Sequence, residues 1–386
     1  DLTECREILT NSFTSWNKGV GRNLIDEGVQ KLLDRLIFIR VAEDRKIEPP
    51  TLIPILREWK SRTVNKKDPL FRDMVIKFRE LDKIYNSNLF SEHPFEKWEE
   101  YDDATEKVIK ILYGKDGFYE NYLGYQLSQS KKQDVATAKG AKKRKEQGIY
   151  YTPAFIVDYI VKNALGPVLN QCQTVTDLQK IRVLDPACGS GSFLVKALEV
   201  IGEKYKEFYH REPTVFDKIQ ILNNNLYGVD LDQKAVEIAR LNLLISTFDS
   251  QTKLPDLSHN IKNGNSLISG TDEELKKYFG PDFRSKKPFN WRGEFPDVFK
   301  QGGFDVIIGN PPYIKEFVSK DAFDGLHDSP YYQGKMDLWT MFGCVSIDLL
   351  KDKGMVGFIA PNNWVSNAGA SIFRDKVLKE GELKIF

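Results

Sequence analysis

The tetrapeptide Asn310-Pro311-Pro312-Tyr313 follows an apolar run and carries the groups best suited to chemistry. Asn310 offers a side-chain carbonyl, and Pro311 offers a backbone carbonyl at a nearly fixed φ. Tyr313 adds an aromatic face. Two acceptors aimed at one amino group, with a ring against a flat heterocycle, indicate a site that binds or methylates an amine. Taken alone, the tetrapeptide is also compatible with a strand-ending turn that has no chemistry.

A second candidate site is the turn that runs from Asp185 through Gly189 and Gly191 to Phe193. The two glycines permit a tight bend and a close approach of the backbone to a ligand. The spacing is not that of a GxGxxG dinucleotide fingerprint, and the Gly-Lys-Ser/Thr of a P-loop is absent. Asp185 would repel phosphates and attract a cationic amino or sulfonium group. We interpret Cys188 in this turn as a small packing residue rather than a nucleophile.

Two further polar positions extend this pattern. Asp230 ends an apolar segment, where a carboxylate can accept both hydroxyls of a ribose. Asn265 follows another short segment and can hydrogen-bond the edge of an adenine. An acid near an amino acid, an acid on a ribose and an amide on an adenine describe S-adenosylmethionine better than NAD.

Alternating strands and helices from about residue 148 are expected to position these groups. We predict strands at 181–185, 226–230, just before Gly264, 304–309 and 354–360, and helices at 154–165, 193–205, 233–248 and 337–350. This rhythm predicts an α/β fold with a doubly wound, mostly parallel sheet, and its ligand sites lie at the carboxyl ends of the strands. Each of the motifs above falls at such an end.

The first part of the chain has the 3.6-residue apolar period of helices. We predict helices at 24–45, from 69 to about 85 and at 103–113, with Pro49, Pro50 and Pro54 breaking the pattern between the first two. Glu58-Trp59-Lys60 has the Glu-x-Lys form of many nucleases, but no strand pattern nearby supplies further acidic ligands. Seven basic residues between 131 and 145 favour equally a loop that contacts DNA phosphates and a solvated linker.

Composition narrows the class of protein. The chain has 386 residues, 41% hydrophobic and 29% charged, with a net charge of +1, as expected for two or three globular domains. No apolar run approaches the length of a membrane span. The four cysteines and four histidines show no metal-ligand or redox spacing, so we expect no metal and a reducing cytoplasm. Because the chain begins at Asp1 rather than Met, we expect a fragment of a longer protein.

Together these motifs resemble those of the adenine-N6 DNA methyltransferases in which the cofactor motifs precede the catalytic one. Tyr150-Tyr151-Thr152-Pro153 is similar to the extra cofactor motif of that family, with Thr152 as a helix N-cap and Pro153 as the first helical residue. The resemblance implies catalysis by Asn310, Pro311, Pro312 and Tyr313. It implies S-adenosylmethionine bound by Tyr150, Tyr151, Thr152, Pro153, Asp185, Ala187, Cys188, Gly189, Gly191, Phe193, Asp230, Leu231, Asn265, Ser266, Asn310 and Leu338.

The helical front segment narrows the resemblance to the middle of type IIG restriction-modification enzymes. It implies a helical connector domain at 1–147 and a Rossmann-like methyltransferase domain at 148–386, incomplete at its C-terminus and without a recognition domain. The expected partner is double-stranded DNA with a flipped adenine. A recognition domain, and in some relatives a nuclease domain, would come from other parts of the parent chain. Two alternatives stay open: a protein glutamine-N5 methyltransferase, and a non-catalytic DNA-binding subunit of a defence complex.

Overall fold

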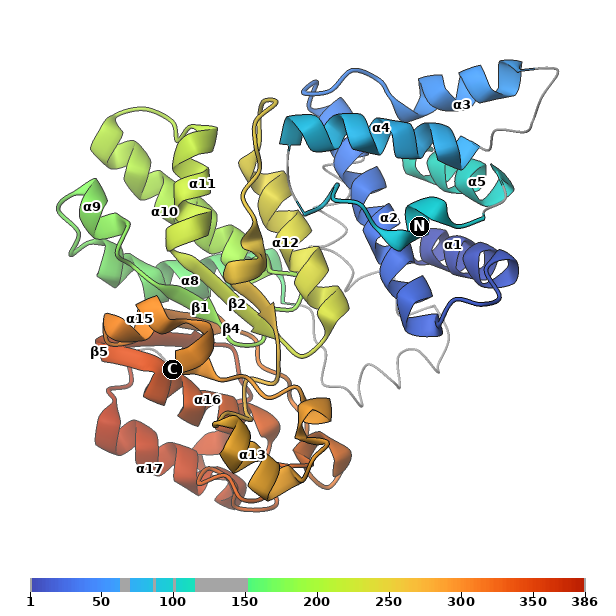
Figure 1. Cartoon of the computed structure of the whole chain (residues 1–386). Coiled ribbons are helices and arrows are strands. Elements are labelled where there is room, and N and C mark those ends of the chain that lie inside the picture. Colours follow the sequence, from blue (N-terminus) through green and yellow to red (C-terminus); the bar gives the residue numbers. More distant parts are fainter. Residues whose placement is uncertain (1, 63–69, 86–87, 100–101, 115–151, 385–386) are drawn as a thin grey trace. The chain divides into compact units, whose positions relative to one another are not determined.

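The computed structural model describes residues 2–62, 70–85, 88–99, 102–114 and 152–384 (Figure 1). The chain divides into two compact units. The first comprises Asp1–Gln126 and Leu244–Asp256, and the second comprises Leu127–Leu243 and Leu257–Phe386. The expected domain boundary at 147 and the basic run at 131–145 lie outside the described residues.

The described part of the first unit is helical. Its elements are α1 (Leu2–Trp16), α2 (Arg22–Asp44), α3 (Leu52–Ser61), α4 (Leu70–Tyr85), the 3-10 helix η1 (Pro94–Lys97) and α5 (Asp102–Tyr113). The predicted helices correspond to α2, α4 and α5. The prediction that Pro54 breaks the pattern is wrong, because Pro54 lies in the first turn of α3, where its missing N–H has no intrahelical partner.

The Glu-x-Lys sequence also lies on α3. Glu58 pairs with Arg62 at 3.0 Å, and Lys60 pairs with Glu106 on α5 at 2.5 Å. These two side chains therefore form ion pairs on a helix, the setting of a packing element rather than of a nuclease strand.

A short segment from much later in the sequence completes the core of the first unit. Phe248 is fully buried and stacks on Phe38 of α2, with ring centroids 4.6 Å apart. Arg45 donates hydrogen bonds to the carbonyl oxygens of Ile245 (2.7 Å) and Phe248 (2.8 Å). The N–H of Leu254 donates to the carbonyl of Tyr85 at 2.9 Å. The helical unit is thus built from two stretches of chain.

The second unit contains a five-stranded parallel sheet in the order β3-β2-β1-β4-β5. The strands are β1 (Val183–Asp185), β2 (Leu226–Asp230), β3 (Ile261–Asn263), β4 (Phe304–Gly309) and β5 (Leu350–Phe358). The order reverses between β1 and β4, because β2 and β3 extend to one side of β1, and β4 and β5 to the other. Such a switch point opens a ligand crevice at the carboxyl ends of the strands. The predicted α/β fold is confirmed.

The second unit also contains ten helices among the described residues (Figure 1). They are α8 (Ala154–Leu169), α9 (Val175–Leu178), α10 (Ser192–Tyr209), α11 (Val215–Asn224), α12 (Gln233–Thr247), α13 (Asp272–Phe279), α14 (Trp291–Glu294), α15 (Pro296–Lys300), α16 (Leu338–Leu349) and α17 (Ser371–Glu380). Short 3-10 helices lie at Leu257–His259, Phe283–Lys286, Asp321–Phe323, Asn362–Val365 and Ala368–Ala370. Helix α8 contacts β4, β5 and α10, and α10 also contacts β1 and β2.

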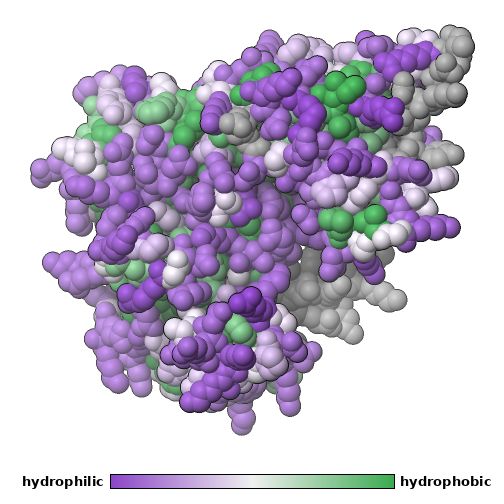
Figure 2. Space-filling view, in the orientation of Figure 1, coloured by the Kyte–Doolittle hydropathy of each residue, from purple (hydrophilic) through white to green (hydrophobic). Residues whose placement is uncertain are grey.

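Strand residues alternate between two packed faces, as the pleat requires. Leu184, Val229 and Ile307 join an aromatic cluster that includes Trp291, Phe295 and Phe304. These strands are therefore buried along their length, and their carboxyl ends are held in fixed register for the residues that follow. On the face of the molecule in Figure 2, hydrophobic side chains appear as small groups among hydrophilic ones. Within the described ranges, no helix has both the length and the apolar character needed to cross a bilayer.

Candidate active site

The sheet brings the tetrapeptide and the carboxylate of Asp185 together at the switch point. Val183 and Leu184 of β1 pair with Val306 and Ile307 of β4, so Asp185 and Gly309 end neighbouring strands. A Cβ atom at Gly309 would lie 2.7 Å from Oδ1 of Asp185. Asn310, the next residue, therefore begins directly beside this buried carboxylate.

The side-chain amide of Asn310 is hydrogen-bonded at both ends. Its Nδ2 donates to Oγ1 of Thr152 at 2.9 Å, and its Oδ1 accepts from the hydroxyl of Tyr313. Thr152 is buried just ahead of α8. The prediction that Thr152 caps this helix is wrong, since Pro153 is the N-cap residue and no side chain caps α8. The Thr152 hydroxyl instead accepts the hydrogen bond from Nδ2 of Asn310 and so orients that side chain.

The Tyr313 hydroxyl has a second acceptor within reach, the carbonyl oxygen of Ile359 at 2.6 Å. A hydroxyl carries one proton, so it donates to one of these two oxygens at a time. When Ile359 accepts that proton, Oδ1 of Asn310 no longer accepts it. Pro311 is buried and Pro312 is half-buried beside them.

Asp185 is only 1% exposed, and its Oδ1 accepts from the N–H of Ala187 at 3.0 Å. Burial, reinforced by the charge of Asp230, raises the pKa of Asp185 to about 8. A carboxylate with so high a pKa gains most from a cation placed next to it, because that cation replaces the lost hydration of the ionised form. The site therefore favours a positively charged ligand group.

The turn after β1 holds Asp230 in place. Gly189 and Gly191 have φ of 51° and 82°, a region that glycine enters without strain. The N–H of Gly189 donates to Oδ2 of Asp230 at 2.8 Å, and the N–H of Asp232 donates to its Oδ1 at 2.9 Å. Burial raises the pKa of Asp230 as well. A Cβ atom at Gly189 would meet no atom within 4 Å, so the backbone of the turn is open at this position.

Cys188 and Phe193 are packing residues of this turn. The Cys188 side chain is buried, and a Cβ at Gly228 would lie 3.1 Å from its Sγ. Burial raises the pKa of Cys188 well above its ordinary value, which disfavours the thiolate that a nucleophile requires. Phe193 is buried in the first turn of α10.

The remaining predicted cofactor residues lie around the same strand ends. The hydroxyl of Ser266 donates to the carbonyl of Pro186 at 2.6 Å, which joins the loop after β3 to the turn after β1. Oδ1 of Asn265 accepts from the N–H of Leu267 at 3.1 Å. Leu231 is 54% exposed after β2, whereas Leu338 is buried in a cluster that also contacts Ala187. Tyr150 and Tyr151 lie outside the described residues.

The sequence did not indicate several residues that support the site. Nδ2 of Asn263 donates to the carbonyls of Asp230 and Leu231, both at 2.9 Å. Nδ2 of Asn242 on α12 donates to the carbonyl of Ser190 at 2.8 Å. These contacts, like the one to Ile359, join residues far apart in sequence, so no local pattern reveals them.

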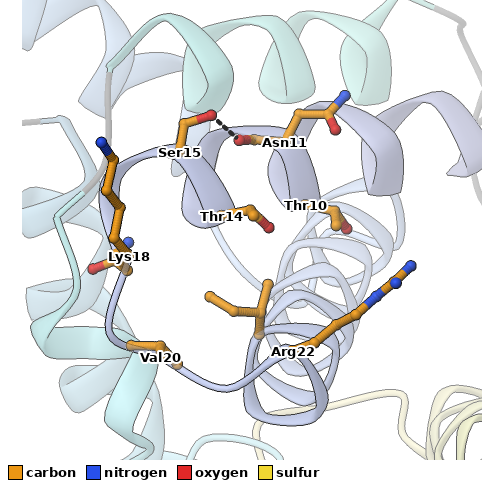
Figure 3. Close-up of a pocket in the computed structure, with 9 residues that line it drawn as sticks. Thr10, Asn11, Thr14, Ser15, Lys18, Val20 and Arg22 are labelled. Atoms are coloured by element: carbon orange, nitrogen blue, oxygen red, sulfur yellow. Dashed lines mark hydrogen bonds between the residues drawn. The ribbon is translucent and has the colours of Figure 1, made fainter.

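One cavity is separate from this cluster of strand-end residues. A cavity of about 540 Å³ in the helical unit is lined by Thr10, Asn11, Thr14, Ser15, Asn17, Lys18, Val20, Arg22 and Ile25 (Figure 3). It shares no residue with the strand ends and contains no carboxylate.

Across the described ranges, no group of three or more His, Cys, Asp or Glu side chains is placed to hold a metal ion.

Comparisons with known proteins find that parts of this chain are similar to methylases. Residues 224–386 match the family described as "Eco57I restriction-modification methylase", and residues 169–265 match "RMKL-like, methyltransferase domain". The chain is 27% identical over 410 residues to the type II restriction enzyme and methyltransferase RM.Eco57I of Escherichia coli, covering 94% of this chain and 38% of that protein. It is 27% identical over 256 residues to the adenine-specific methyltransferase PglX of Streptomyces coelicolor, covering 58% of this chain and 20% of PglX.

The fold has a counterpart among solved structures. The type IIL restriction-modification enzyme MmeI, solved in complex with DNA, matches with a TM-score of 0.67 and 17% identity over 98% of this chain and 53% of MmeI. These findings confirm the resemblance to restriction-modification methyltransferases that the motifs predict. The chain spans well under half the length of the curated relatives named above.

Proposed function

We propose that this chain, related to the restriction-modification methylases, transfers a methyl group from S-adenosylmethionine to N6 of an adenine flipped out of double-stranded DNA. The observation that carries the proposal is the junction of β1 and β4. There a buried carboxylate suited to a cation lies against Gly309, and the amide of Asn310 follows immediately. A cationic methyl donor and an amine acceptor held on these two strand ends would be adjacent.

The residues present fit this cofactor. Asp185 would attract the cationic part of its amino-acid end, and Asp230 would accept hydrogen bonds from the ribose. The open space at Gly189 would let the ligand approach the backbone of the turn that follows Asp185. Asn265, Ser266, Leu231, Leu338 and Ala187 would surround the adenine, and Thr152, Pro153, Tyr150 and Tyr151 would flank the amino-acid end. When bound, the cofactor supplies a methyl group already activated by its positive sulfur, so the protein requires no metal.

The protein contributes positioning and preorganised dipoles. An aromatic amine is a weak nucleophile because its lone pair is delocalised into the ring. Oδ1 of Asn310 and the carbonyl of Pro311 would accept its two hydrogens and direct the lone pair away from the ring. Thr152 fixes the orientation of the Asn310 amide. The Tyr313 hydroxyl can donate to Ile359 instead of Asn310, so a hydrogen of the amine would take its place at Oδ1 of Asn310.

The target atom is inaccessible within a duplex, so the adenine must leave the base stack and pack against Tyr313 and Pro312. We propose that the parent protein acts in the cytoplasm in a restriction-modification or phage-defence system. Residues 1–147 would form its helical connector domain and residues 148–386 its methyltransferase domain. A recognition domain, and in some relatives a nuclease domain, would come from the parent chain.

The test is transfer of a tritiated methyl group to unmethylated double-stranded DNA, followed by separation of the nucleosides. We expect the label in N6-methyl-2′-deoxyadenosine. Label on the side chain of a protein glutamine would instead indicate a protein methyltransferase. Binding of S-adenosylmethionine by calorimetry with no label on any acceptor would favour a non-catalytic DNA-binding subunit.

A further inference from the structure

We propose that the turn from Lys315 to Ser319 contacts duplex DNA and that Phe317 fills the gap left in the base stack by the flipped adenine. This inference rests on the proposed function and extends the same site by a surface for the duplex. It follows from four features of the turn: an ordered base, an apolar tip, closeness to Tyr313 and two lysines.

The base of the turn is ordered by hydrogen bonds. The N–H groups of Val318 and Ser319 donate to the carbonyl of Lys315 at 2.9 and 3.2 Å. Beneath the turn, Lys315 bridges Asp337 in an antiparallel arrangement, and the N–H of Glu316 donates to the carbonyl of Met336 at 3.0 Å. The chain is therefore fixed on both sides of Phe317.

The Glu316 side chain adds a further anchor. Its carboxylate accepts from the Tyr332 hydroxyl and from the N–H of Lys335. These bonds lower the pKa of Glu316, so the group stays ionised and engaged with its own loop. Glu316 is thus held beneath the tip rather than presented as a repulsive charge.

The tip of this ordered turn is apolar. Phe317 is 75% exposed, and its neighbour Val318 is 56% exposed. Single exposed apolar residues are ordinary on protein surfaces. Two adjacent ones on a turn with so many backbone bonds indicate a surface that the fold positions but does not itself bury.

The tip lies near the proposed site of the extrahelical base. Phe317 is the fourth residue after Tyr313, so the Cα atoms of the two lie at most about 14 Å apart. Proteins that disturb a duplex commonly insert apolar side chains between its bases. An aromatic ring at this distance from the catalytic tetrapeptide can stack on the bases that flank the vacated position.

The charge around the tip matches a phosphate backbone. Nζ of Lys315 lies 5.8 Å from the centroid of the Phe317 ring, and Lys320 follows the turn directly. Among the described residues, neither lysine forms an ion pair at 4.0 Å or less. Two cations beside an apolar wedge fit the phosphate backbone of DNA better than an apolar protein surface, which offers no anion to either lysine.

The experiment compares methyl transfer to duplex DNA with transfer to the same strands kept single, because a single strand needs no base flipping. We expect Phe317→Ala to reduce transfer to the duplex about tenfold or more, in line with the loss of one base–aromatic stack. Transfer to the single strand and affinity for S-adenosylmethionine should not change. Phe317→Trp should retain duplex activity.

A matched control is Phe216→Ala, since Phe216 on α11 is 68% exposed and lies in neither the turn nor the strand-end cluster. A second measurement is the salt dependence of DNA binding, whose slope should fall by about one in Lys320→Ala. Equal losses on duplex and single strand, no loss at all, or the same loss in Phe216→Ala would refute the wedge. If the unaltered protein methylates neither form of DNA, the proposed function fails and this inference fails with it.

Discussion

Asn310 is a single residue whose side-chain amide is oriented by hydrogen bonds, one of them to a distant part of the chain. Its amide is held by Thr152 on one side and by Tyr313 on the other. We expect Asn310→Ala to remove nearly all methyl transfer, because one of the two acceptors for the amine is lost. Affinity for S-adenosylmethionine, measured by calorimetry, should fall less than threefold. Unchanged turnover in this variant would rule out the proposed mechanism.

Thr152 permits a finer test of the same contact. Thr152→Val keeps the shape of the side chain but removes the hydroxyl that accepts from Nδ2 of Asn310. We expect kcat to fall by roughly tenfold, in line with about 1.4 kcal/mol for a lost hydrogen bond that positions the amide. Thr152→Ser should restore the rate. A loss of thermal stability with no change in kcat would indicate a purely structural role.

Asp185 predicts a dependence of cofactor binding on pH. Burial raises the pKa of Asp185 to about 8, so the free protein holds this group largely protonated at neutral pH. A cationic ligand favours the ionised form. Affinity should therefore rise with pH, by at most about tenfold per unit, and level off above 8. Calorimetry at pH 6 to 9 should show this rise in the unaltered protein and a weak, flatter profile in Asp185→Asn.

The same group affects stability in the opposite direction. Because its pKa is higher in the folded than in the unfolded chain, Asp185 contributes stability that is full below about pH 4 and is lost as pH rises through 8. Urea unfolding without ligand should show a smaller decline over this range in Asp185→Asn. An identical decline in both proteins would show that Asp185 is ionised throughout.

At the scale of elements, the junction of β1 and β4 depends on the missing side chain of Gly309. We expect Gly309→Ala to destabilise the protein by about 1–3 kcal/mol, because the added carbon would lie 2.7 Å from the fixed Asp185 carboxylate. Cofactor affinity should fall as well. Gly166→Ala in α8 is the control, since a Cβ there meets no atom within 4 Å. Denaturant unfolding should show no loss of stability in that variant.

The elements also show what local sequence predicts. Strands β2 and β4 have the predicted bounds, because each is a continuous apolar run between turns, as buried parallel strands require. Helices α1, α3, α9, α11, α13, α14, α15 and α17 were missed. In α3, Pro54 suggested a break, although a first helical turn tolerates proline. β5 begins at Leu350, whereas the prediction started it at 354. The early residues Lys351 to Lys353 were not recognised as strand because they are polar and partly exposed on an edge strand.

The placement of the candidate site residues at strand ends was predicted, but their contacts were not. The positions of Asp185, Asp230 and Asn310 at strand ends follow from the βα rhythm alone. The use of the Thr152 hydroxyl does not, since its partner is 158 residues away. A local helix-capping rule was applied to a residue whose hydrogen bond is set by the tertiary structure.

At the scale of the whole molecule, the first unit depends on the later segment Leu244–Asp256. We expect Phe248→Ala to destabilise the helical unit by about 3–5 kcal/mol, because a fully buried ring stacked on Phe38 is removed. Hydrogen exchange should show faster exchange in α2 and α4. Protection in these helices that equals that of the unaltered protein would show that the segment is dispensable.

This two-part construction limits how such proteins can be recombined. A chimaera joined at a single crossover near residue 150 would receive the helices from one parent and Phe248 from the other. Its aromatic stack and the Arg45 hydrogen bonds would then be formed between unmatched sequences. An exchange of the helical unit between two such proteins therefore has to include Leu244–Asp256 as a second exchanged segment.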